Sequence, residues 1–357
     1  MLDIKITKTT HPKEKPQDES KLGFGKKFSD HMFLMDYTAG EGWHDARIVP
    51  YGPWEMDPAT TVFHYAQEIF EGMKAYRTAD GKIQLFRPDC NANRFNDSAD
   101  RLGMPPIPPE DFVQAVKALV DVDRDWVPHS DGASLYIRPF CIATDVGLGV
   151  HAAKHYRFAI ICAPSGAYYA EGLDPVRIYV EDEYIRAAPG LTGFTKCGGN
   201  YAASLLGEYK GVENGCEQVC FVDAATKTYL EELGGMNMMA VHKDGHVETP
   251  SLTGNILPGV TRRSLIQLLQ DKGHDVVETM IALDQLLEDI KSGEVTEVFA
   301  CGTAAIITPI GRFKSEKFDV TVADGGSGKL TCELRDELLG IQLGEVEDPH
   351  NWMWKVC

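Results

Sequence analysis

The stretch FTKCGGNYAAS, residues 194–204, places a lysine two residues before a Gly-Gly pair and an Asn-Tyr that opens an alanine-rich segment. Glycine at 198 and 199 removes side chains where another group must approach the backbone closely. Taken alone, Lys196 is most simply a solvated lysine at a helix entrance, because lysines are rarely buried. Its surroundings favour a second interpretation, in which a partly desolvated amine loses its proton and becomes a nucleophile.

The composition limits the kind of protein that surrounds this stretch. The chain has 357 residues, of which 43% are hydrophobic and 25% are charged, and this is typical of a globular protein with about two domains. Asp and Glu outnumber Lys and Arg by 53 to 35, and the net charge of -18 disfavours nucleic acid or an anionic membrane as partner. Nine cysteines lack the paired spacing of a zinc site, and no apolar run is long enough to cross a bilayer. We therefore expect a cytoplasmic protein without a metal site.

Strand and helix patterns follow one another along the whole chain. In the N-terminal part, residues 82–88 and 133–143 read as strands and residues 108–128 as a helix. In the C-terminal part, helices are expected after an N-cap at Asn200 and from Val260, among strand patterns at residues 176–188, 217–223, 236–250 and 296–310. The order predicts an α/β protein of the α+β type with two lobes.

Small and turn-forming residues interrupt the periodic segments around residues 163–175, which makes this stretch the best candidate for an interdomain linker. We expect four parts: a flexible N-terminus over residues 1–22, a smaller α+β domain over 23–165, a linker over 166–174, and a larger cofactor-binding domain over 175–357.

A reactive lysine of this kind points to pyridoxal phosphate, whose aldehyde condenses with an amine to form a Schiff base. The cofactor also demands a carboxylate at its ring nitrogen and an anion site for its phosphate. Glu232, just before a Gly-Gly pair, is the candidate carboxylate. Val260 and Thr261 begin a predicted helix, where free N–H groups favour an anion. Tyr201 offers a phenol that can hydrogen-bond a ring oxygen.

Two further segments complete the candidate set. Arg94 lies within a predicted helix and can present a charged fork to a phosphate. Small residues follow a predicted strand at residues 301–310, so that the amides of Thr303 and Ala304 can approach a carboxylate. Each motif alone is also compatible with a role unrelated to catalysis, such as a solvated side chain, a helix start that binds water, or tight packing.

The order and near-spacing of the motifs resemble those of the branched-chain amino-acid aminotransferases, members of the fold-type IV pyridoxal phosphate enzymes. The resemblance runs from about Phe24 to NWMWK near the C-terminus and is greatest to the longer branch that includes the animal enzymes. It rests on HYAQEIFEGMKAY, NRFNDSADRLGMP, SLYIRPF, GAYY, KCGGNYAASLL, ELGGMN, ILPGVTRRS and GTAAIITPI.

The resemblance implies reversible amino transfer between L-leucine, L-isoleucine or L-valine and 2-oxoglutarate, giving the branched 2-oxo acid and L-glutamate. Lys196 would carry the cofactor and move the α-proton, Glu232 would face the ring nitrogen, and Tyr201 would lie near the ring oxygen. Phosphate contacts are implied for Arg94, Val260, Thr261 and Thr303.

The same resemblance implies how substrates are held. The substrate carboxylate would take the amides of Thr303 and Ala304 and the hydroxyl of Tyr136. Arg138, with Tyr65, would hold the distal carboxylate of glutamate. In the family Tyr65 and Val150 come from the neighbouring subunit, so a homodimer is implied. An apolar pocket, worth about 2 kcal/mol for two or three methyl groups, would be lined by Phe24, Tyr65, Val150 and Tyr168.

Other functions stay open at this point. D-amino-acid transamination and the lyase reaction on aminodeoxychorismate belong to the same fold, and SLYIRPF and GAYY count against both. A non-catalytic ligand-binding protein on this scaffold is disfavoured because Lys196 and Glu232 are both present. Animal members carry a CxxC pair where this chain has Ala305 and Thr308, so redox control through that pair is not expected. A hydroxyl contact is also in doubt at Gly235, where animal members have threonine.

Overall fold

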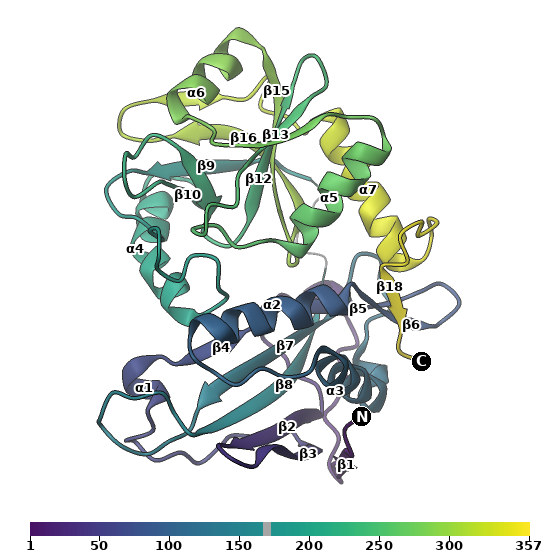
Figure 1. The fold of residues 1–357 in the computed structure, drawn as a ribbon. Helices are drawn as coiled ribbons and strands as arrows, with labels where there is room; N and C mark the ends of the chain where they lie inside the picture. Colours follow the sequence, from purple (N-terminus) through teal and green to yellow (C-terminus); the bar gives the residue numbers. More distant parts are fainter. Residues whose placement is uncertain (167–172) are drawn as a thin grey trace. The chain divides into compact units, whose positions relative to one another are not determined.

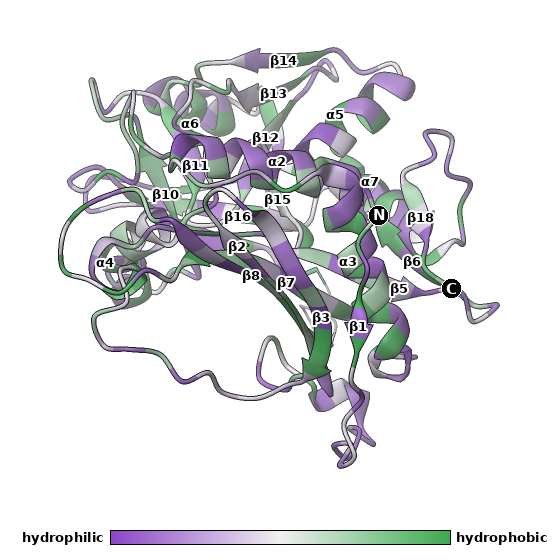
Figure 2. Cartoon of the chain, turned by 60° about the horizontal axis from the view of Figure 1, so that its bottom comes forward, coloured by the Kyte–Doolittle hydropathy of each residue, from purple (hydrophilic) through white to green (hydrophobic). Residues whose placement is uncertain are grey.

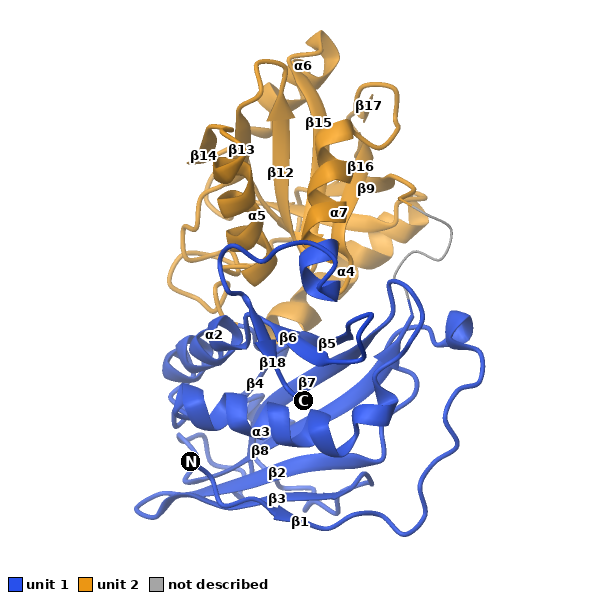
Figure 3. Cartoon of the chain, turned by 90° about the vertical axis from the view of Figure 1, so that its right-hand side faces the viewer, with its two compact units in different colours: residues 1–170, 196–198, 340–357 blue, residues 171–195, 199–339 orange. Residues whose placement is uncertain are grey.

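The computed structural model describes residues 1–166 and 173–357. The described chain is mixed α+β structure built on two nine-stranded sheets, which confirms the fold class expected from the sequence. It divides into two compact units, coloured separately in Figure 3. Unit 1 contains residues 1–170, 196–198 and 340–357, and unit 2 contains residues 171–195 and 199–339.

This division differs in two places from the expected one. Residues 340–357 group with unit 1, because β18 (Met353–Lys355) pairs with β6 (Ile83–Phe86). The N-terminal residues are also engaged, since β1 (Lys5–Ile6) pairs in parallel with β3 (Gly42–Pro50). The expected linker lies mostly in residues 167–172, outside the described residues, and stays a prediction.

The sheet of unit 1 is almost entirely antiparallel and runs in the order β1-β3-β2-β8-β7-β5-β6-β18, with β4 paired to β7 (Figure 1). The remaining elements are β2 (His31–Thr38), β4 (Glu68–Phe70), β5 (Met73–Arg77), β7 (Ser134–Ala143), β8 (His155–Ser165), α1 (Val62–Tyr65), α2 (Pro88–Arg101), α3 (Pro109–Val122) and two 3-10 turns, Glu19–Lys21 and Arg124–Trp126. Strands β6 and β7 and helix α3 confirm the sequence predictions for these segments.

Aromatic packing joins the helices of unit 1 to its sheet. Phe95 of α2 and Phe112 of α3 contact Phe158 of β8, with ring centres 5.4 and 5.6 Å apart, and Phe33 of β2 packs on the same ring at 5.9 Å. All four side chains are at most 1% exposed. Burying such a cluster is a large hydrophobic contribution, so α2 is held firmly against the sheet.

Unit 2 is built on a mixed sheet in the order β11-β10-β9-β16-β15-β12-β13-β14, with β17 paired to β16. Its elements are β9 (Val176–Glu181), α4 (Gly198–Glu213), β10 (Gln218–Val222), β11 (Leu230–Leu233), β12 (Asn237–His242), β13 (Val247–Pro250), α5 (Val260–Asp271), β14 (Val276–Thr279), α6 (Leu283–Ser292), β15 (Val295–Gly302), β16 (Ile306–Lys314), β17 (Asp319–Thr321) and α7 (Lys329–Leu343), whose last residues belong to unit 1. The hairpin at residues 236–250 and helix α5 confirm two predictions.

Helix α4 differs from the prediction in two respects. It begins at Gly198, so Asn200 is not its cap; the Asn200 amide instead donates to the carbonyls of Thr192 and Thr195, at 2.7 and 2.9 Å. Its buried face is made of small residues, and a Cβ at Gly207 would lie 3.1 Å from the Phe221 ring. The helix therefore approaches the sheet through glycine, and its apolar side chains stay exposed.

Among the residues that the structure describes, no helix combines the length and the apolar character that crossing a membrane requires.

Candidate active site

Lys196 is held by its backbone between β4 and α2. Its carbonyl accepts the N–H of Phe70 at 2.9 Å, and its own N–H donates to the hydroxyl of Ser98 at 3.0 Å. Two residues on, the N–H of Gly198 donates to the carboxylate of Glu68, and a Cβ at Gly198 would collide with that carboxylate. Glycine at 198 is thus required by a close approach, as the sequence suggested.

The side chain of Lys196 lies over an aromatic ring. Its Nζ is 4.8 Å from the centre of the Phe70 ring, and the guanidinium of Arg138 lies at the same distance from that ring. Such cation–π contacts favour the charged forms. Phe70 is therefore in contact with both Lys196 and Arg138, two of the cations that the sequence singled out.

Helix α2 supplies buried polar groups beside this cluster. The helix is largely hydrophilic (Figure 2), yet Asn91, Arg94 and Ser98 are each at most 6% exposed. The guanidinium of Arg94 forms a fork with the fully buried carboxylate of Glu71, with Nε–Oε1 2.7 Å and Nη2–Oε2 2.9 Å. Asn91 also donates to Glu71, at 2.8 Å. Buried polar groups of this kind, fully paired, fix one geometry.

The charges of this cluster bias the protonation of Lys196. Burial, and after it the nearby positive charge of Arg94, lower the pKa of the Lys196 amine to about 8, although the charge of Glu71 opposes the change. Burial would raise the pKa of Glu71, but the Arg94 charge and hydrogen bonds bring it below its ordinary value. Burial lowers the pKa of Lys74 to about 8 as well, so the low pKa alone does not distinguish Lys196.

Tyr136 and Arg138 project from β7 on one face, since they are two residues apart on a strand. Arg138 Nη2 donates to the Tyr136 hydroxyl at 3.0 Å, whereas its buried Nε has no hydrogen-bond partner among the described residues. The ring of Phe24 packs edge-on against Tyr136 at 4.7 Å. A Cβ at Gly72 would lie 2.1 Å from the Tyr136 hydroxyl, so glycine there makes room for the phenol.

Tyr65 and Val150 are exposed in the single chain, at 39% and 81%. The Tyr65 hydroxyl donates to the carbonyl of Leu148, in the same loop as Val150. Tyr168 lies outside the described residues.

In unit 2, Glu232 lies on the short strand β11 and is 2% exposed. Its carboxylate forms an ion pair with Arg186 and accepts the N–H of Leu257 at 3.3 and 3.4 Å. Arg186 is itself 6% exposed, and its Nη1 also donates to the carbonyl of Asn255 at 3.2 Å. Burying a carboxylate is costly unless it is paired, and Arg186 supplies the opposite charge.

Helix α5 begins beside the same loop. Val260 and Thr261 form its first turn, and its N-cap residue, Gly259, contributes no side-chain cap. The amide of Asn237 donates to the carbonyl of Leu257 at 3.0 Å, and a Cβ at Gly259 would lie 2.1 Å from the Asn237 oxygen. An uncapped helix start with free N–H groups suits an anion.

Thr303 and Ala304 lie in the turn between β15 and β16. A Cβ at Gly302 would lie 3.2 Å from Met236 and 3.6 Å from the carbonyl of Gly235, so this turn packs closely on the loop that follows Glu232. Tyr201 is partly buried in the first turns of α4.

The predicted residues thus fall into two sets. Unit 1 brings together Lys196, Arg94, Tyr136, Arg138 and Phe24, and unit 2 brings the Glu232 loop near the start of α5 and the β15–β16 turn. Sequence reasoning missed Phe70, Glu71 and Arg186. Phe70 and Glu71 stand directly before Gly72 in IFEG, and this glycine could have indicated that another group approaches the backbone there. No sequence signal marked Arg186.

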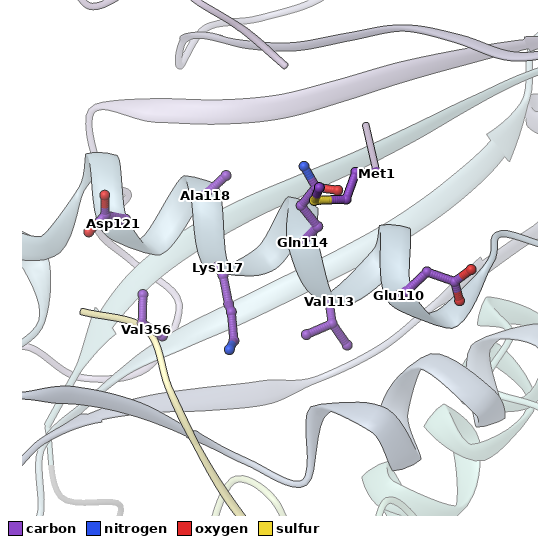
Figure 4. Close-up of a pocket in the computed structure, with 8 residues that line it drawn as sticks. All are labelled: Met1, Glu110, Val113, Gln114, Lys117, Ala118, Asp121 and Val356. Atoms are coloured by element: carbon purple, nitrogen blue, oxygen red, sulfur yellow. The ribbon is translucent and has the colours of Figure 1, made fainter. Parts of the chain in front are cut away.

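A groove of about 450 Å³ lies elsewhere on unit 1, along α3 and beside Val356 (Figure 4). Its lining contains none of the expected site residues.

Residues 68–313 match the family model of amino-transferase class IV, and the chain belongs to this family. It is 49% identical to the branched-chain-amino-acid aminotransferase of Mycolicibacterium smegmatis, over 99% of this chain and 98% of that protein. Branched-chain-amino-acid transaminase 1 of Bacillus subtilis is 50% identical, over 99% of both chains.

Solved structures agree with this assignment. The branched-chain amino acid aminotransferase of Escherichia coli has a TM-score of 0.76 at 28% identity, covering 92% of this chain and 99% of that one. The T.th. enzyme of the same name, in complex with N-(5'-phosphopyridoxyl)-L-glutamate, has a TM-score of 0.75 at 27% identity, covering 90% of this chain and 98% of that one.

Proposed function

We propose that this chain is a pyridoxal-phosphate-dependent branched-chain-amino-acid aminotransferase. It transfers the amino group reversibly between L-leucine, L-isoleucine or L-valine and 2-oxoglutarate. The observation that carries the proposal is the partly buried Lys196 amine, with its pKa of about 8, beside Phe70 and Arg138. The full-length identity of about half to relatives with this name supports the choice of substrate class.

The residues of each unit fit the cofactor that this reaction needs. Unit 1 offers an amine with a lowered pKa and the buried guanidinium of Arg94. Unit 2 offers the buried carboxylate of Glu232 and the uncapped first turn of α5, where Val260 and Thr261 can take a phosphate. When bound, the cofactor supplies an aldehyde for the substrate amine and an electron-poor ring that stabilises negative charge at the α-carbon.

The chain's own residues then hold and move protons. Lys196 would take the proton from the substrate α-carbon and return it in the reverse half-reaction. Glu232 would face the ring nitrogen and favour its protonated form, and Arg186 supplies the opposite charge beside Glu232. Tyr201 would donate a hydrogen bond to the ring oxygen. Glu71 orients Arg94, so that one side of the guanidinium is fixed while the remainder serves the phosphate together with Thr303.

Substrate selection follows from the residues around Tyr136. By the family resemblance, the amides of Thr303 and Ala304 and the Tyr136 hydroxyl would take the α-carboxylate of every substrate. Phe24 and Phe70 contact Tyr136 and Arg138, respectively, and would line the side-chain pocket. The family resemblance adds Tyr168 and, from a neighbouring subunit, Tyr65 and Val150. Arg138 lies at the edge of this apolar group and receives the distal carboxylate of glutamate, which lets one pocket accept both substrate classes.

The decisive experiment is a spectral titration. Purified protein loaded with pyridoxal phosphate should show the visible absorption of lysine-bound cofactor, which L-leucine should bleach and 2-oxoglutarate should restore. D-leucine separates D-amino-acid transamination from this proposal, because it should leave the band unchanged. No bleaching by any of the three L-substrates would exclude the proposal, and bleaching by D-leucine alone would favour the rival.

Replacing Arg138 with methionine should separate the two substrate classes. We expect kcat/KM for 2-oxoglutarate to fall about 10- to 100-fold, because a hydrogen bond to a charged group is worth about 1.5–3 kcal/mol, while kcat/KM for L-leucine changes much less. Arg157→Met is a matched control, since Arg157 also stacks on an aromatic ring, Trp54, in unit 1. An equal loss for both substrates would show that Arg138 only supports the fold.

The exposed apolar residues of this chain support a homodimer. Val146, Leu148 and Val150 are 63–81% exposed in one loop. Helix α4 likewise exposes an apolar stripe, formed by Leu205, Leu206, Tyr209 and Val212. Contiguous apolar patches of this kind usually mark protein interfaces.

The mass in solution tests the dimer directly. Light scattering during size-exclusion chromatography should give twice the chain mass of 39.4 kDa, and Leu206→Asp should shift the protein towards the monomer by placing a charge in the interface. Thr10→Asp, at an exposed position of unit 1, adds the same single charge and is the control for a charge change alone. A wild-type monomer that turns over L-leucine would refute the dimer without affecting the proposed reaction.

We also propose a cytoplasmic location. All nine cysteines are free in the structure, and seven of them are buried. Unpaired thiols in this number suit a reducing compartment. Fractionation of the source cells with an antibody would test this.

A further inference from the structure

The turn of the β12–β13 hairpin brings together two histidines and a glutamate of unit 2. His242 donates its backbone N–H to the carbonyl of His246 at 2.9 Å, and Gly245, with φ +93°, lets the three-residue turn close. Side chains two residues apart on a strand share a face. Glu248 therefore lies on the same side of the hairpin as His246, and Ala240 of β12 is its partner in the strand register.

The distances between these groups are close to those of a metal site. His242 Nε2 lies 3.4 Å from one carboxylate oxygen of Glu248, and His246 Nε2 lies 4.0 Å from the other. One ligand atom from each residue lies within 4.8 Å of the other two. Bonds of about 2.0–2.2 Å in a tetrahedral site place ligand atoms about 3.4 Å apart, so the turn already approximates the geometry.

The two imidazole rings require one adjustment. They stack with centres 3.9 Å apart and planes 16° from parallel, whereas lone pairs that meet at one ion need the rings to tilt apart. The side chain of His246 is 28% exposed and can rotate, while that of His242 is 13% exposed and is held by the sheet. The movement is therefore confined to the outer ring.

The neighbouring groups leave the Nε2 atoms of His246 and His242 available as metal ligands. Asp244 and the Nδ1 of His246 lie 2.6 Å apart, so the carboxylate holds the proton on Nδ1 and leaves Nε2 free as a ligand. The Nε2 of His242 is buried and lacks a hydrogen-bond partner among the described residues, although Glu248 is near. A buried polar atom of this kind calls for a ligand.

We propose that His242, His246 and Glu248 bind one divalent transition-metal ion of the zinc type, which clamps the β12–β13 hairpin. Two imidazoles and one carboxylate suit Zn²⁺ and its neighbours rather than Mg²⁺ or Ca²⁺, which prefer oxygen ligands alone. Three protein ligands leave a fourth position for water. The ligand His242 is the last residue of β12, whereas Asn237, which donates to the loop that contacts Glu232, is the first. The proposed ion is thus at the other end of the strand, where it stabilises the fold and takes no part in amino transfer.

Isothermal titration of the chelator-treated holoenzyme with Zn²⁺ tests the site. We expect one ion per chain, and His246→Gln and Glu248→Gln should each weaken binding at least about 10-fold. His11→Gln, at an exposed histidine of unit 1, should bind as the wild type. Because protons compete for the same atoms, wild-type affinity should fall as the pH is lowered. Zn²⁺ should also raise the melting temperature of the wild type but not of the two variants.

Two results would overturn the proposal: no saturable binding to the wild type, or unchanged binding in both variants, which would place the ion on other groups such as cysteines. If a variant fails to fold, anomalous diffraction from wild-type crystals soaked in Zn²⁺ decides the question, because the peak must lie between the three side chains. Amino transfer by the metal-free enzyme should be unchanged, so the outcome is independent of the proposed reaction.

Discussion

Replacing Lys196 with methionine is expected to lower kcat for L-leucine by at least about four orders of magnitude, because it removes both the nucleophile and the proton carrier. The visible band of bound cofactor should disappear, although cofactor can still bind through the phosphate and ring contacts. Methionine nearly preserves the side-chain volume, so no large cavity is made. Steady-state kinetics and absorption spectra of the purified variant measure both effects.

The same substitution should stabilise the protein without cofactor. The pKa of Lys196 is about 8 in the fold and 10.5 as a free side chain, so at neutral pH folding places a protonated amine where the charge is disfavoured. We expect Lys196→Met to raise the free energy of unfolding by about 2–3 kcal/mol at pH 7, allowing for partial exposure.

The sign of the pH dependence follows from proton counts. Between pH 8 and 10.5 the unfolded chain binds the Lys196 proton and the fold does not, so wild-type stability rises with pH across this window. The advantage of Lys196→Met should therefore be complete below pH 8 and vanish towards pH 10.5. Urea unfolding of the two cofactor-free proteins at several pH values measures this.

Lys74 provides the matched control, since burial lowers its pKa to about 8 as well. Borohydride reduction of the loaded wild-type enzyme should fix the cofactor on the peptide that contains Lys196 and leave the Lys74 peptide unlabelled. Label on Lys74, or full activity of Lys196→Met, would contradict the proposed role.

Replacing Glu232 with glutamine should lower both catalysis and stability. Without the carboxylate the ring nitrogen loses its ionic partner, and we expect kcat to fall about 100- to 1,000-fold. Arg186 would also be left as a buried charge without its partner, which typically costs about 3–5 kcal/mol. Kinetics with saturating cofactor and urea unfolding separate the two effects.

Glu231 is the natural control because it is the neighbouring buried glutamate. It is 6% exposed and accepts a hydrogen bond from Asn255 at 2.6 Å, and burial raises its pKa. Glu231→Gln should therefore retain most of the activity. If both variants lose kcat equally, the effect belongs to the strand and not to the Glu232 charge.

Much of the fold could be predicted because local patterns and tertiary structure agree. Glycines mark the turn within residues 236–250 and the end of helix α5, at Gly245 and Gly273, so the positions of these elements were predictable. The strand pattern at residues 176–188 was too long: β9 ends at Glu181, and the rest of that segment supplies Arg186 to Glu232. Alternating hydrophobicity cannot show where a strand stops pairing with its neighbours in the sheet.

The prediction for helix α4 was incomplete for a related reason. The sequence predicted a helix here but not the side that faces the sheet, which Gly207 decides through its close approach to Phe221. A helix with glycine on one side and leucine on the other can pack either side against a sheet. The proposed metal site was missed because two histidines separated by three residues, without paired cysteines, are a weak signal, and Glu248 joins them only through the turn.

By itself the sequence determined the order of motifs, the fold class and the family, and with them the lysine at the centre of the proposed chemistry. Only the tertiary structure decided which charges meet: Glu71 with Arg94, Arg186 with Glu232, and His242 with His246 and Glu248. The reason is that motif order and periodicity are properties of the chain read in one direction. Ion pairs between distant residues depend instead on strand register and loop path, which emerge only when the whole core packs.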